Sequence, residues 1–307
     1  MDSIVARHFS DAARIKLVRS KSRVRFYRVE DNGEPLFAKY FDFDGSYEQA
    51  EAEYSALRWY ESNNRNPAYT VTPPRECIRV GSERGIVVTN YVKMARADHW
   101  LNVSARLPFL RRRILRQIAG WMANFHEMST ETVDGLDLET TIDPLIESLT
   151  GQARRHSRVI DDEKLLQLRT LSGELLPSGQ IHGDLVAHNI FFSKEKVVVC
   201  DFGLSNKNFL YIDVSKFLVS LIWRSRFLYI RFNKRIFFGD VHLFHEYYKI
   251  EGEQIELKTL SFFLLMSISV KISGLERKIA SKKRPNLIDR LHIRVLLEAA
   301  DSVIERL

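Results

Sequence analysis

The sequence predicts an α+β protein in which an antiparallel sheet with one helix is followed by a larger, mainly helical part. Two observations support this prediction. The first ninety residues contain short runs of β-branched and aromatic residues separated by turn residues, a pattern typical of strands. In the rest of the chain, apolar residues recur at helical spacing, most clearly over 107–128 and 287–307.

The N-terminal sheet is predicted from its apolar runs. They cover 15–18, 24–30, 36–40, 77–80 and 86–89. The turn signal Asp31-Asn32-Gly33-Glu34 joins the second run to the third as a hairpin. Between the third and fourth runs, the apolar spacing predicts a helix over 46–60, with Ser46 as its N-cap.

The helical part begins with an apolar stripe over 107–128, which predicts a core helix. Within it, Arg111-Arg112-Arg113 is interpreted as a solvated face and His126 as a packed or capping histidine. The apolar run 259–270 is too short to cross a bilayer, since a spanning helix needs about 20 residues. We therefore expect no membrane span.

Composition limits the class of protein. The chain has 307 residues, 45% of them hydrophobic, which is enough for one large or two small domains. Its net charge of +7 favours contact with an anionic partner. Cys77 and Cys200 are the only cysteines, so there is no disulfide framework and a reducing, cytoplasmic location is expected.

Two motifs in the middle of the chain carry the chemistry. The first is His182-Gly183-Asp184-Leu185 with Asn189 five positions after the aspartate, and the second is Asp201-Phe202-Gly203. Between them, 190–192 and 197–200 are predicted to be strands joined by the polar turn 193–196. That hairpin would fold Asp201 back beside Asn189. Phosphoryl transfer needs this combination of a carboxylate that orients a hydroxyl and oxygen ligands for magnesium.

The paired motifs resemble the catalytic and metal-binding loops of the protein-kinase-like superfamily. The His-Gly-Asp form is similar to the aminoglycoside phosphotransferase and choline kinase branch. This resemblance implies a two-lobed protein-kinase-like fold, with a nucleotide-binding lobe over 1–92 and a catalytic and acceptor-binding lobe over 93–307. It also implies an ATP:alcohol phosphotransferase that uses ATP and Mg²⁺.

The resemblance assigns roles to the two motifs. Asp184 would accept or orient the proton of the acceptor hydroxyl, and Asn189 and Asp201 would bind Mg²⁺. His182 is expected to brace the loop rather than to react. Gly183 is expected to allow close backbone packing where protein kinases have an arginine, and the loss of that arginine argues against regulation by a phosphorylated activation loop.

Further roles fall in the first ninety residues. Lys39, on a predicted apolar strand, has the position of the lysine that binds the α- and β-phosphates. Glu53 is chosen as its carboxylate partner because it precedes a helix leucine by four residues, with Glu51 as the alternative. The loop between the first two strands has no glycine, so Ser20 and Ser22 are the candidates for covering the phosphates.

Adenine would bond the Asn90 carbonyl and the Val92 amide, because 89–92 resembles the hinge of related kinases. Asp213, at the start of a predicted buried helix, is interpreted as structural. The segment 223–249 interleaves cations with aromatic residues. It is open to three interpretations: a site at the membrane surface, on its inner face, or for a lipid-linked acceptor, stacking on nucleic acid, or core aromatics with solvated cations.

The acceptor is predicted to be a small molecule. Asp213 follows only ten positions after Gly203, with no Ala-Pro-Glu motif between them, which leaves little room for a peptide platform. Because the chain is basic, we favour a sugar or cell-envelope glycan, as in lipopolysaccharide kinases, over a cationic aminoglycoside. We do not expect a nucleic-acid partner. Two alternatives are kept: an atypical protein kinase of the small type linked to tRNA modification, and a catalytically silent nucleotide-binding scaffold.

Overall fold

The structure is a computed structural model. It describes residues 3–21, 23–104, 107–133, 136, 138–158, 160–224, 234–250, 252–281 and 287–307. The chain forms two compact units. Unit 1 comprises Met1–Ala95, His182–Asp184 and Asn189–Asn206, and unit 2 comprises the remainder. Both sequence motifs therefore contribute to the unit that holds the N-terminal sheet, although the chain reaches them only after passing through much of unit 2.

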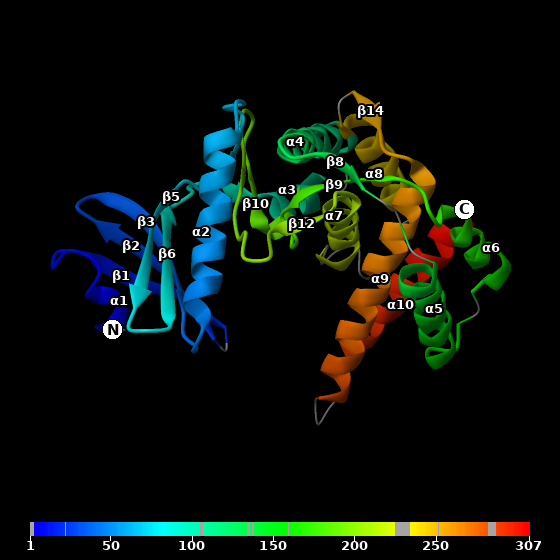
Figure 1. The fold of residues 1–307 in the computed structure, drawn as a ribbon, viewed down its shortest axis with the longest axis horizontal. Coiled ribbons are helices and arrows are strands. Elements are labelled where there is room, and N and C mark those ends of the chain that lie inside the picture. The colour runs from blue at the N-terminus through cyan, green and yellow to red at the C-terminus, as the bar shows by residue number, and fades with distance from the viewer. Residues whose placement is uncertain are drawn as a thin grey trace. The chain divides into compact units, whose positions relative to one another are not determined.

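Unit 1 is built on a five-stranded antiparallel sheet of order β1-β2-β3-β6-β5 (Figure 1). Its strands are β1 (Arg14–Lys21), β2 (Val24–Asp31), β3 (Glu34–Phe41), β5 (Pro74–Val80) and β6 (Arg84–Asn90). The predicted turn between β2 and β3 is present, and Asn32 and Gly33 both have positive φ, at 49° and 80°. These are the backbone angles that a two-residue type I′ turn requires.

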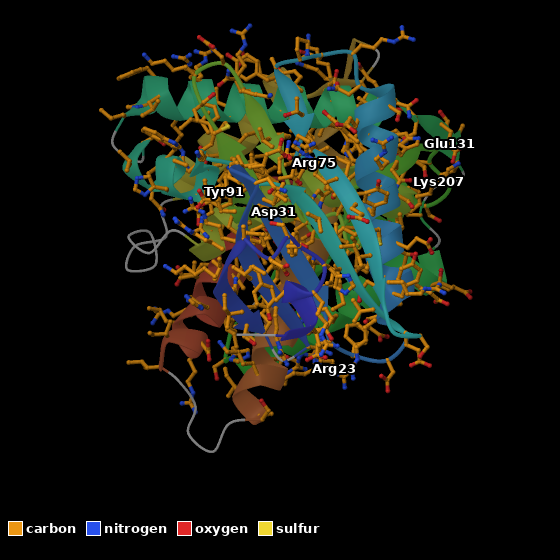
Figure 2. The ribbon with its side chains drawn as sticks, turned by 90° about the vertical axis from the view of Figure 1, so that its left-hand side faces the viewer. Arg23, Asp31, Arg75, Tyr91, Glu131 and Lys207 are labelled. Carbon is orange, nitrogen blue, oxygen red and sulfur yellow. The ribbon has the colours of Figure 1, made fainter. Side chains whose placement is uncertain are left out.

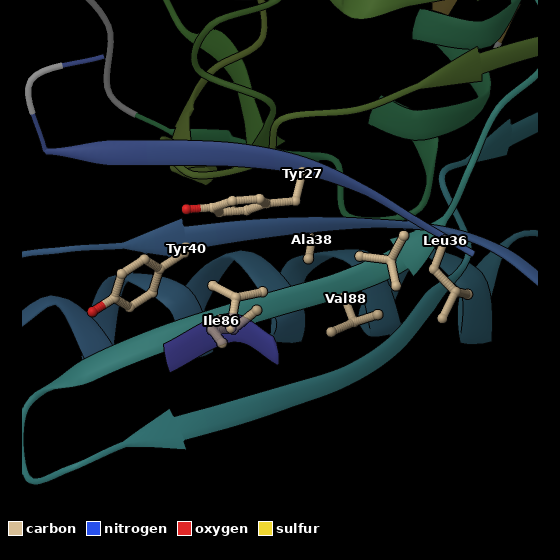
Figure 3. Close-up of a cluster of buried hydrophobic side chains, with 8 residues drawn as sticks. Tyr27, Leu36, Ala38, Tyr40, Ile86 and Val88 are labelled. Atoms are coloured by element: carbon tan, nitrogen blue, oxygen red, sulfur yellow. The ribbon is translucent and has the colours of Figure 1, made fainter. Parts of the chain in front are cut away.

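One face of this sheet is closed by an apolar cluster (Figure 3). Alternate residues of β2, β3 and β6 supply it, together with Val5 of the short helix α1 (Ser3–Ala6). Its buried members are Val5, Tyr27, Val29, Leu36, Ala38, Tyr40, Ile86 and Val88. Because side chains alternate across a strand, the intervening residues, including Phe26 and Lys39, belong to the opposite face.

Two further parts of unit 1 position the motifs. Helix α2 (Ser46–Asn63) packs on β5 and β6. Its N-cap is Gly45, not Ser46 as predicted; the Ser46 hydroxyl is buried and donates to the Phe41 carbonyl instead. The hairpin of β10 (Ile190–Phe192) and β11 (Val197–Val199) forms as predicted, and β11 also pairs in parallel with β4 (Tyr69–Val71).

Unit 2 is mainly helical, as the sequence predicted. Its helices are α3 (Ala97–Val103), α4 (Pro108–Glu127), α5 (Asp143–Arg155), α6 (Asp162–Leu166), α7 (Tyr211–Arg224), α8 (Lys234–Tyr247), α9 (Leu257–Ala280) and α10 (Leu287–Ile304). Its strands are β8 (Glu131–Val133), β9 (Leu176–Ile181), β12 (Asn206–Phe209), β13 (Lys249–Ile250) and β14 (Glu253–Gln254), and β7 (Ala95–Arg96) falls where unit 1 ends. The helices α7 and α10 pack against α9, which forms the centre of this core.

The apolar run 259–270 lies within α9, a helix of 24 residues. By length and composition α9 could cross a membrane, so the length argument made from the sequence was wrong. It is the one helix among the described residues that meets this test. However, 56% of its apolar window is buried inside the protein. Side chains such as Phe262 and Leu265 are fully buried, as in the core helix of a globular unit.

Arg111 corrects a second sequence interpretation. It was assigned to a solvated face, but it is 7% exposed and forms a two-pronged ion pair with Asp240 of α8, which is 2% exposed. Its third hydrogen bond goes to the Leu101 carbonyl. The neighbouring Arg112 is exposed, as predicted. The charge of Arg111 is buried because its carboxylate partner is buried with it.

Candidate active site

Three charged side chains meet on the face of the unit 1 sheet that lies opposite to the apolar cluster. We call this face the inner face and the face with the apolar cluster the outer face. The ammonium of Lys39, on β3, lies 2.7 Å from Glu53 Oε2 and 2.5 Å from Asp201 Oδ1. Lys39 is 9% exposed and Glu53 4% exposed. One buried cation therefore holds two carboxylates that come from α2 and from the second motif. An ammonium so deeply buried needs such partners.

The charges of this cluster control one another's protonation. Burial opposes the charge of Lys39, but the carboxylates of Glu53 and Asp201 together raise its pKa above the ordinary value. Burial also disfavours the ionised form of Asp201, yet Lys39 is the main influence that brings its pKa below the ordinary value. The pKa of Glu53 is raised by burial, against the attraction of Lys39. Lys39 and Asp201 thus remain charged at neutral pH.

The structure places Glu53, rather than Glu51, against the lysine. Glu51 is exposed on α2 and accepts a hydrogen bond from Tyr47. Gly203 leaves space beside Glu53, since a Cβ at this position would lie 3.1 Å from Glu53 Oε2, a tight contact, and 3.7 Å from Lys39 Nζ. The glycine of the second motif therefore leaves room for the ion pair.

Asp201 is positioned by strand β11 and by an unusual backbone conformation. The Cys200 amide donates to the Asn189 carbonyl, which extends the β10–β11 hairpin by one bond and sets Asp201 next to the end of the first motif. Asp201 has φ 71°, a left-handed conformation that is rare for a residue other than glycine. Backbone strain of this kind is characteristic of functional sites.

The first motif is braced by His182, as predicted. Its ring is fully buried; Nε2 donates to the Cys200 carbonyl at 2.9 Å, and Nδ1 accepts from the Asp184 amide at 3.2 Å. A carbonyl can only accept and an amide can only donate, so His182 is the neutral Nε2–H tautomer. The histidine therefore ties the loop of Asp184 to the strand that precedes Asp201.

Gly183 is required by geometry. It has φ +79°, and a Cβ there would lie 2.1 Å from the Leu204 carbonyl oxygen. No larger residue fits without moving the backbone. This supports the sequence interpretation that the glycine allows close packing at the position where protein kinases carry an arginine.

The donor set at the end of the hairpin fits a magnesium ion. Asn189 is 3% exposed and its Nδ2 donates to the Asp184 carbonyl at 3.0 Å, so the amide group is held in place while its oxygen is the atom suited to bind metal. Asp201 supplies an ionised carboxylate. Among the described residues, no group of three or more His, Cys, Asp or Glu side chains could hold a metal ion. Carboxylate and amide oxygens are ligands that suit Mg²⁺, which proteins often bind through one or two side chains together with substrate phosphates.

Comparison with known families decides the identity of the chain. The family model of the phosphotransferase enzyme family, APH, matches residues 14–240. This protein belongs to that family. It is a phosphotransferase enzyme. No curated protein sequence matches the chain.

Solved structures share the fold of this phosphotransferase at low sequence identity. Amicoumacin kinase hAmiN aligns with a TM-score of 0.61 and 11% identity, over 99% of this chain and 93% of the kinase. A thermostable mutant of aminoglycoside phosphotransferase APH(4)-Ia aligns with a TM-score of 0.59 and 10% identity, over 99% of this chain and 98% of the mutant. A choline/ethanolamine kinase family protein from Mesorhizobium loti aligns with a TM-score of 0.52 and 15% identity, over 95% of this chain and 88% of that protein. The predicted α+β kinase-like fold class is therefore confirmed.

Among the described residues, Ser20, Asn90 and Val92 are further predicted nucleotide contacts of this phosphotransferase, and none of them is an ion-pair partner of Lys39. Ser20 is exposed and pairs with Arg25, so it shares the face of the sheet opposite to Lys39. Ser22 lies outside the described residues. The hinge residues lie at the end of β6: the Asn90 amide donates to the Pro73 carbonyl. Val92 follows beyond the end of β6, and the contacts of Asn90 and Val92 with adenine stay predictions.

Two residues of unit 2 have the structural roles that the sequence suggested. His126 and Asp213 are fully buried. His126 Nε2 lies 3.3 Å from Asp213 Oδ2, and its Nδ1 lies 2.5 Å from the hydroxyl of Tyr248. The tyrosine hydroxyl donates and the carboxylate accepts, so the histidine crosslinks α4 to α7. Of the basic and aromatic segment 223–249, residues 225–233 lie outside the described part; beyond them, Phe237, Phe244 and Tyr248 are buried.

Two aromatic residues beside Lys39 escaped the sequence analysis. The ammonium of Lys39 lies 5.0 Å from the ring centre of Phe41 and 6.0 Å from that of Phe26. Phe26 and Lys39 are direct partners in the β2–β3 pairing, so they share one face. The signal was available, because Lys39 and Phe41 are two positions apart on one strand. The sequence could not show that these rings would face an ammonium rather than a closed apolar core.

Proposed function

We propose that this phosphotransferase transfers the γ-phosphoryl group of ATP to a hydroxyl group of a small molecule. The observation that carries the proposal is the convergence of Lys39 on Glu53 and Asp201, with Asn189 and Asp184 on the adjoining loop. Transfer of a phosphoryl group depends on positioning and on neutralising charge, and these groups supply both functions. No covalent enzyme intermediate is needed.

Each side chain has a distinct role in this proposal. Lys39 binds the α- and β-phosphates, and Glu53 keeps it oriented. Asn189 and Asp201 would hold Mg²⁺, which supplies positive charge to the phosphate oxygens when it is bound. Asp184 orients the acceptor hydroxyl and accepts its proton. The hydrogen bonds of His182 and Asn189 to the backbone of Asp184 support this role, because they fix the loop that carries the carboxylate.

The solved relatives support the choice of ligands. The amicoumacin kinase structure is a complex with AMP-PNP, Ca²⁺ and Ami. The APH(4)-Ia structure is a complex with ADP and hygromycin B, and that of spectinomycin phosphotransferase a complex with ADP and spectinomycin. These proteins thus combine a nucleotide, in one case a divalent cation, and a small acceptor. A preference for Mg²⁺ and a cytoplasmic location are part of our proposal for this chain.

For the acceptor we propose a neutral or anionic sugar, such as a cell-envelope glycan. The support is electrostatic: the chain carries 46 Lys and Arg against 39 Asp and Glu, and a surplus of cations does not attract a polycationic aminoglycoside. This preference concerns the choice among acceptors and does not affect the assignment of the phosphoryl donor.

The test is transfer from γ-³²P-ATP with Mg²⁺ to a panel of neutral sugars, phosphorylated sugars, envelope glycan extracts, aminoglycosides and a generic protein substrate. We expect label on a sugar or glycan, and none on any acceptor with Asp184→Ala. Label on an aminoglycoside alone would overturn the acceptor class. Label on protein alone would favour the atypical protein kinase. Nucleotide binding without transfer to any acceptor would favour the silent scaffold.

A further inference from the structure

A second lysine shares the inner face of the sheet with Lys39. Lys21 ends strand β1, where it pairs with Val24, and Val24 in turn pairs with Phe41 of β3. Two residues along β2, Phe26 pairs with Lys39. Because alternate residues point to the same side of a sheet, Lys21 and Lys39 lie on one face.

The ring of Phe26 links the two lysines. The ammonium of Lys21 lies 5.9 Å from its centre and that of Lys39 lies 6.0 Å from it. A cation at this distance from an aromatic ring is attracted to it, which restrains an otherwise long and flexible side chain. Lys39 is neutralised by two carboxylates, whereas Lys21 is exposed and has no ion-pair partner among the described residues.

The ion pairs of Lys39 leave Lys21 as a further cation on this face. The ammonium of Lys39 already contacts two carboxylates, those of Glu53 and Asp201. A phosphate bound at Lys39 would therefore meet a second ammonium, that of Lys21, on the same face of the sheet.

The position of Lys21 along the sheet, relative to the predicted adenine contacts, agrees with a role in phosphate binding. Figure 2 shows Tyr91, next to the predicted adenine contacts, and Arg23, at the tip of the β1–β2 hairpin, at different ends of unit 1. Lys39 falls between them along β3. A nucleotide with its base at Asn90 and Val92 and its α- and β-phosphates at Lys39 would therefore extend its terminal phosphate toward the hairpin, where Lys21 lies.

We propose that Lys21 binds the terminal phosphate of ATP. The β1–β2 loop has no glycines whose backbone could cover the phosphates, and Lys21 would contact the terminal phosphate instead. The proposal rests on the proposed function, since it assumes that Lys39 holds a nucleotide. It also corrects the part that we assigned to this hairpin: the contact comes from a lysine on the inner face rather than from the Ser20 hydroxyl on the outer face. The enzyme would then distinguish ATP from ADP partly through one side chain.

The test compares Lys21→Gln with Lys16→Gln. Lys16 is an exposed lysine of the same strand that pairs with Arg28, five positions from Lys21, so both variants lose one charge. Calorimetric titrations with AMP-PNP, ADP and AMP, each with Mg²⁺ at one fixed salt concentration, give the affinities. We expect Lys21→Gln to weaken AMP-PNP about tenfold, or about 1.4 kcal/mol, to weaken ADP less, and to leave AMP unchanged. Lys16→Gln should match the wild type.

Other outcomes separate the two proposals. If the wild type prefers AMP-PNP to AMP but Lys21→Gln binds all three ligands like Lys16→Gln, the role of Lys21 is overturned and the proposed function stands. An equal loss for AMP and AMP-PNP also overturns it, because a terminal-phosphate contact cannot affect AMP. If the wild type binds no nucleotide, both proposals fail. Lys16 and Lys21 are both exposed, so neither substitution should change the fold. Melting curves of the two variants check this.

Discussion

The ammonium nitrogen of Lys39 lies 2.5 Å from Oδ1 of Asp201, a residue 162 positions later in the chain. Without nucleotide, the lysine that would hold phosphate is thus bonded to the carboxylate that would hold metal. Phosphate and Mg²⁺ can replace this bond together: phosphate gives the lysine a new anion, and the metal gives the aspartate a new cation. We therefore expect nucleotide and metal to bind cooperatively.

The cooperativity of nucleotide and metal is a first prediction. AMP-PNP should bind at least about tenfold more tightly with Mg²⁺ than with EDTA, a difference of about 1.4 kcal/mol. By linkage, it should raise the melting temperature more when the metal is present. Titration calorimetry and thermal melting both measure this difference. Equal affinity in EDTA would show that the Lys39–Asp201 bond does not respond to metal.

Glu53→Gln tests the lysine partner. Without this negative charge Lys39 is less well oriented, and both nucleotide affinity and transfer should fall, by about tenfold or more in transfer rate. Glu51→Gln is the matched control, because it removes the same charge two residues earlier, at an exposed position of α2. We expect it to behave like the wild type. Equal effects of the two substitutions would contradict the assignment.

The sequence predicted most of unit 1 because its signals are local. Alternating apolar residues, the Asn32-Gly33 turn and the polar turn after β10 each depend on a few neighbouring residues, and all form as predicted. Two departures from the sequence interpretation depend on partners distant in the chain. Arg111 is buried because Asp240 meets it, and Ser20 lies on the face opposite to Lys39 because of the pairing of β1 with β2. The length of helix α9 has a local cause, since polar residues at its C-terminal end continue the same helix.

The candidate site shows the same limit. Asp184, Asn189 and Asp201 were predicted from the two motifs, in which residue type and spacing are enough, and Lys39 from its place on an apolar strand. Glu53 needed a choice between two glutamates that only the helix orientation decides. Lys21 carries no motif at all: its relation to Phe26 and Lys39 follows from the strand register, and a register is a property of two chain segments together.

The pH dependence of stability tests the charge of Asp201. Its pKa is lower in the folded protein than its ordinary value, so the carboxylate adds stability above about pH 4, and this contribution is lost as the pH falls through the folded-state pKa. The pKa of Glu53 is raised in the folded protein, so its ionisation lowers the stability as the pH rises, which is opposite to the effect of Asp201. The gap in unfolding free energy between the wild type and Asp201→Asn should be constant from about pH 7 to pH 5 and shrink below about pH 4. Urea titrations measure it, and a gap independent of pH would contradict the charged pair.

Asp184→Asn tests the assignment of the base. The side chain keeps its size but can no longer accept a proton, so transfer should fall by about 10²–10⁴-fold. Affinity for AMP-PNP should stay near that of the wild type, because the residue contacts the acceptor rather than the nucleotide. Rapid-quench measurement of transfer, together with calorimetry, separates the two effects. Normal transfer by this variant would show that another group accepts the proton.

Gly183→Ala should destabilise the protein through geometry alone. The new Cβ would meet the Leu204 carbonyl, and alanine disfavours the φ of +79°. Left-handed strain alone costs about 1–3 kcal/mol, and the clash adds to it. Gly274→Ala is the matched control. This glycine lies within α9, and apart from the neighbouring backbone of its own helix no atom lies within 4 Å of the added Cβ, so the change should stabilise by about 0.5–1 kcal/mol. Denaturant titrations should therefore give shifts of opposite sign.

The buried pair of Arg111 and Asp240 offers a test in unit 2 that is independent of catalysis. Arg111→Met leaves Asp240 buried without its cation, and the loss of one partner of such a pair costs about 3–5 kcal/mol. Burial already raises the pKa of Asp240 against the influence of Arg111, so this carboxyl should become protonated more readily in the variant. The double variant Arg111→Met/Asp240→Leu removes both charges and should recover most of the lost stability, because no isolated charge remains. A double variant less stable than Arg111→Met would show that the pair itself, rather than the avoidance of an unpaired charge, stabilises the contact between α4 and α8.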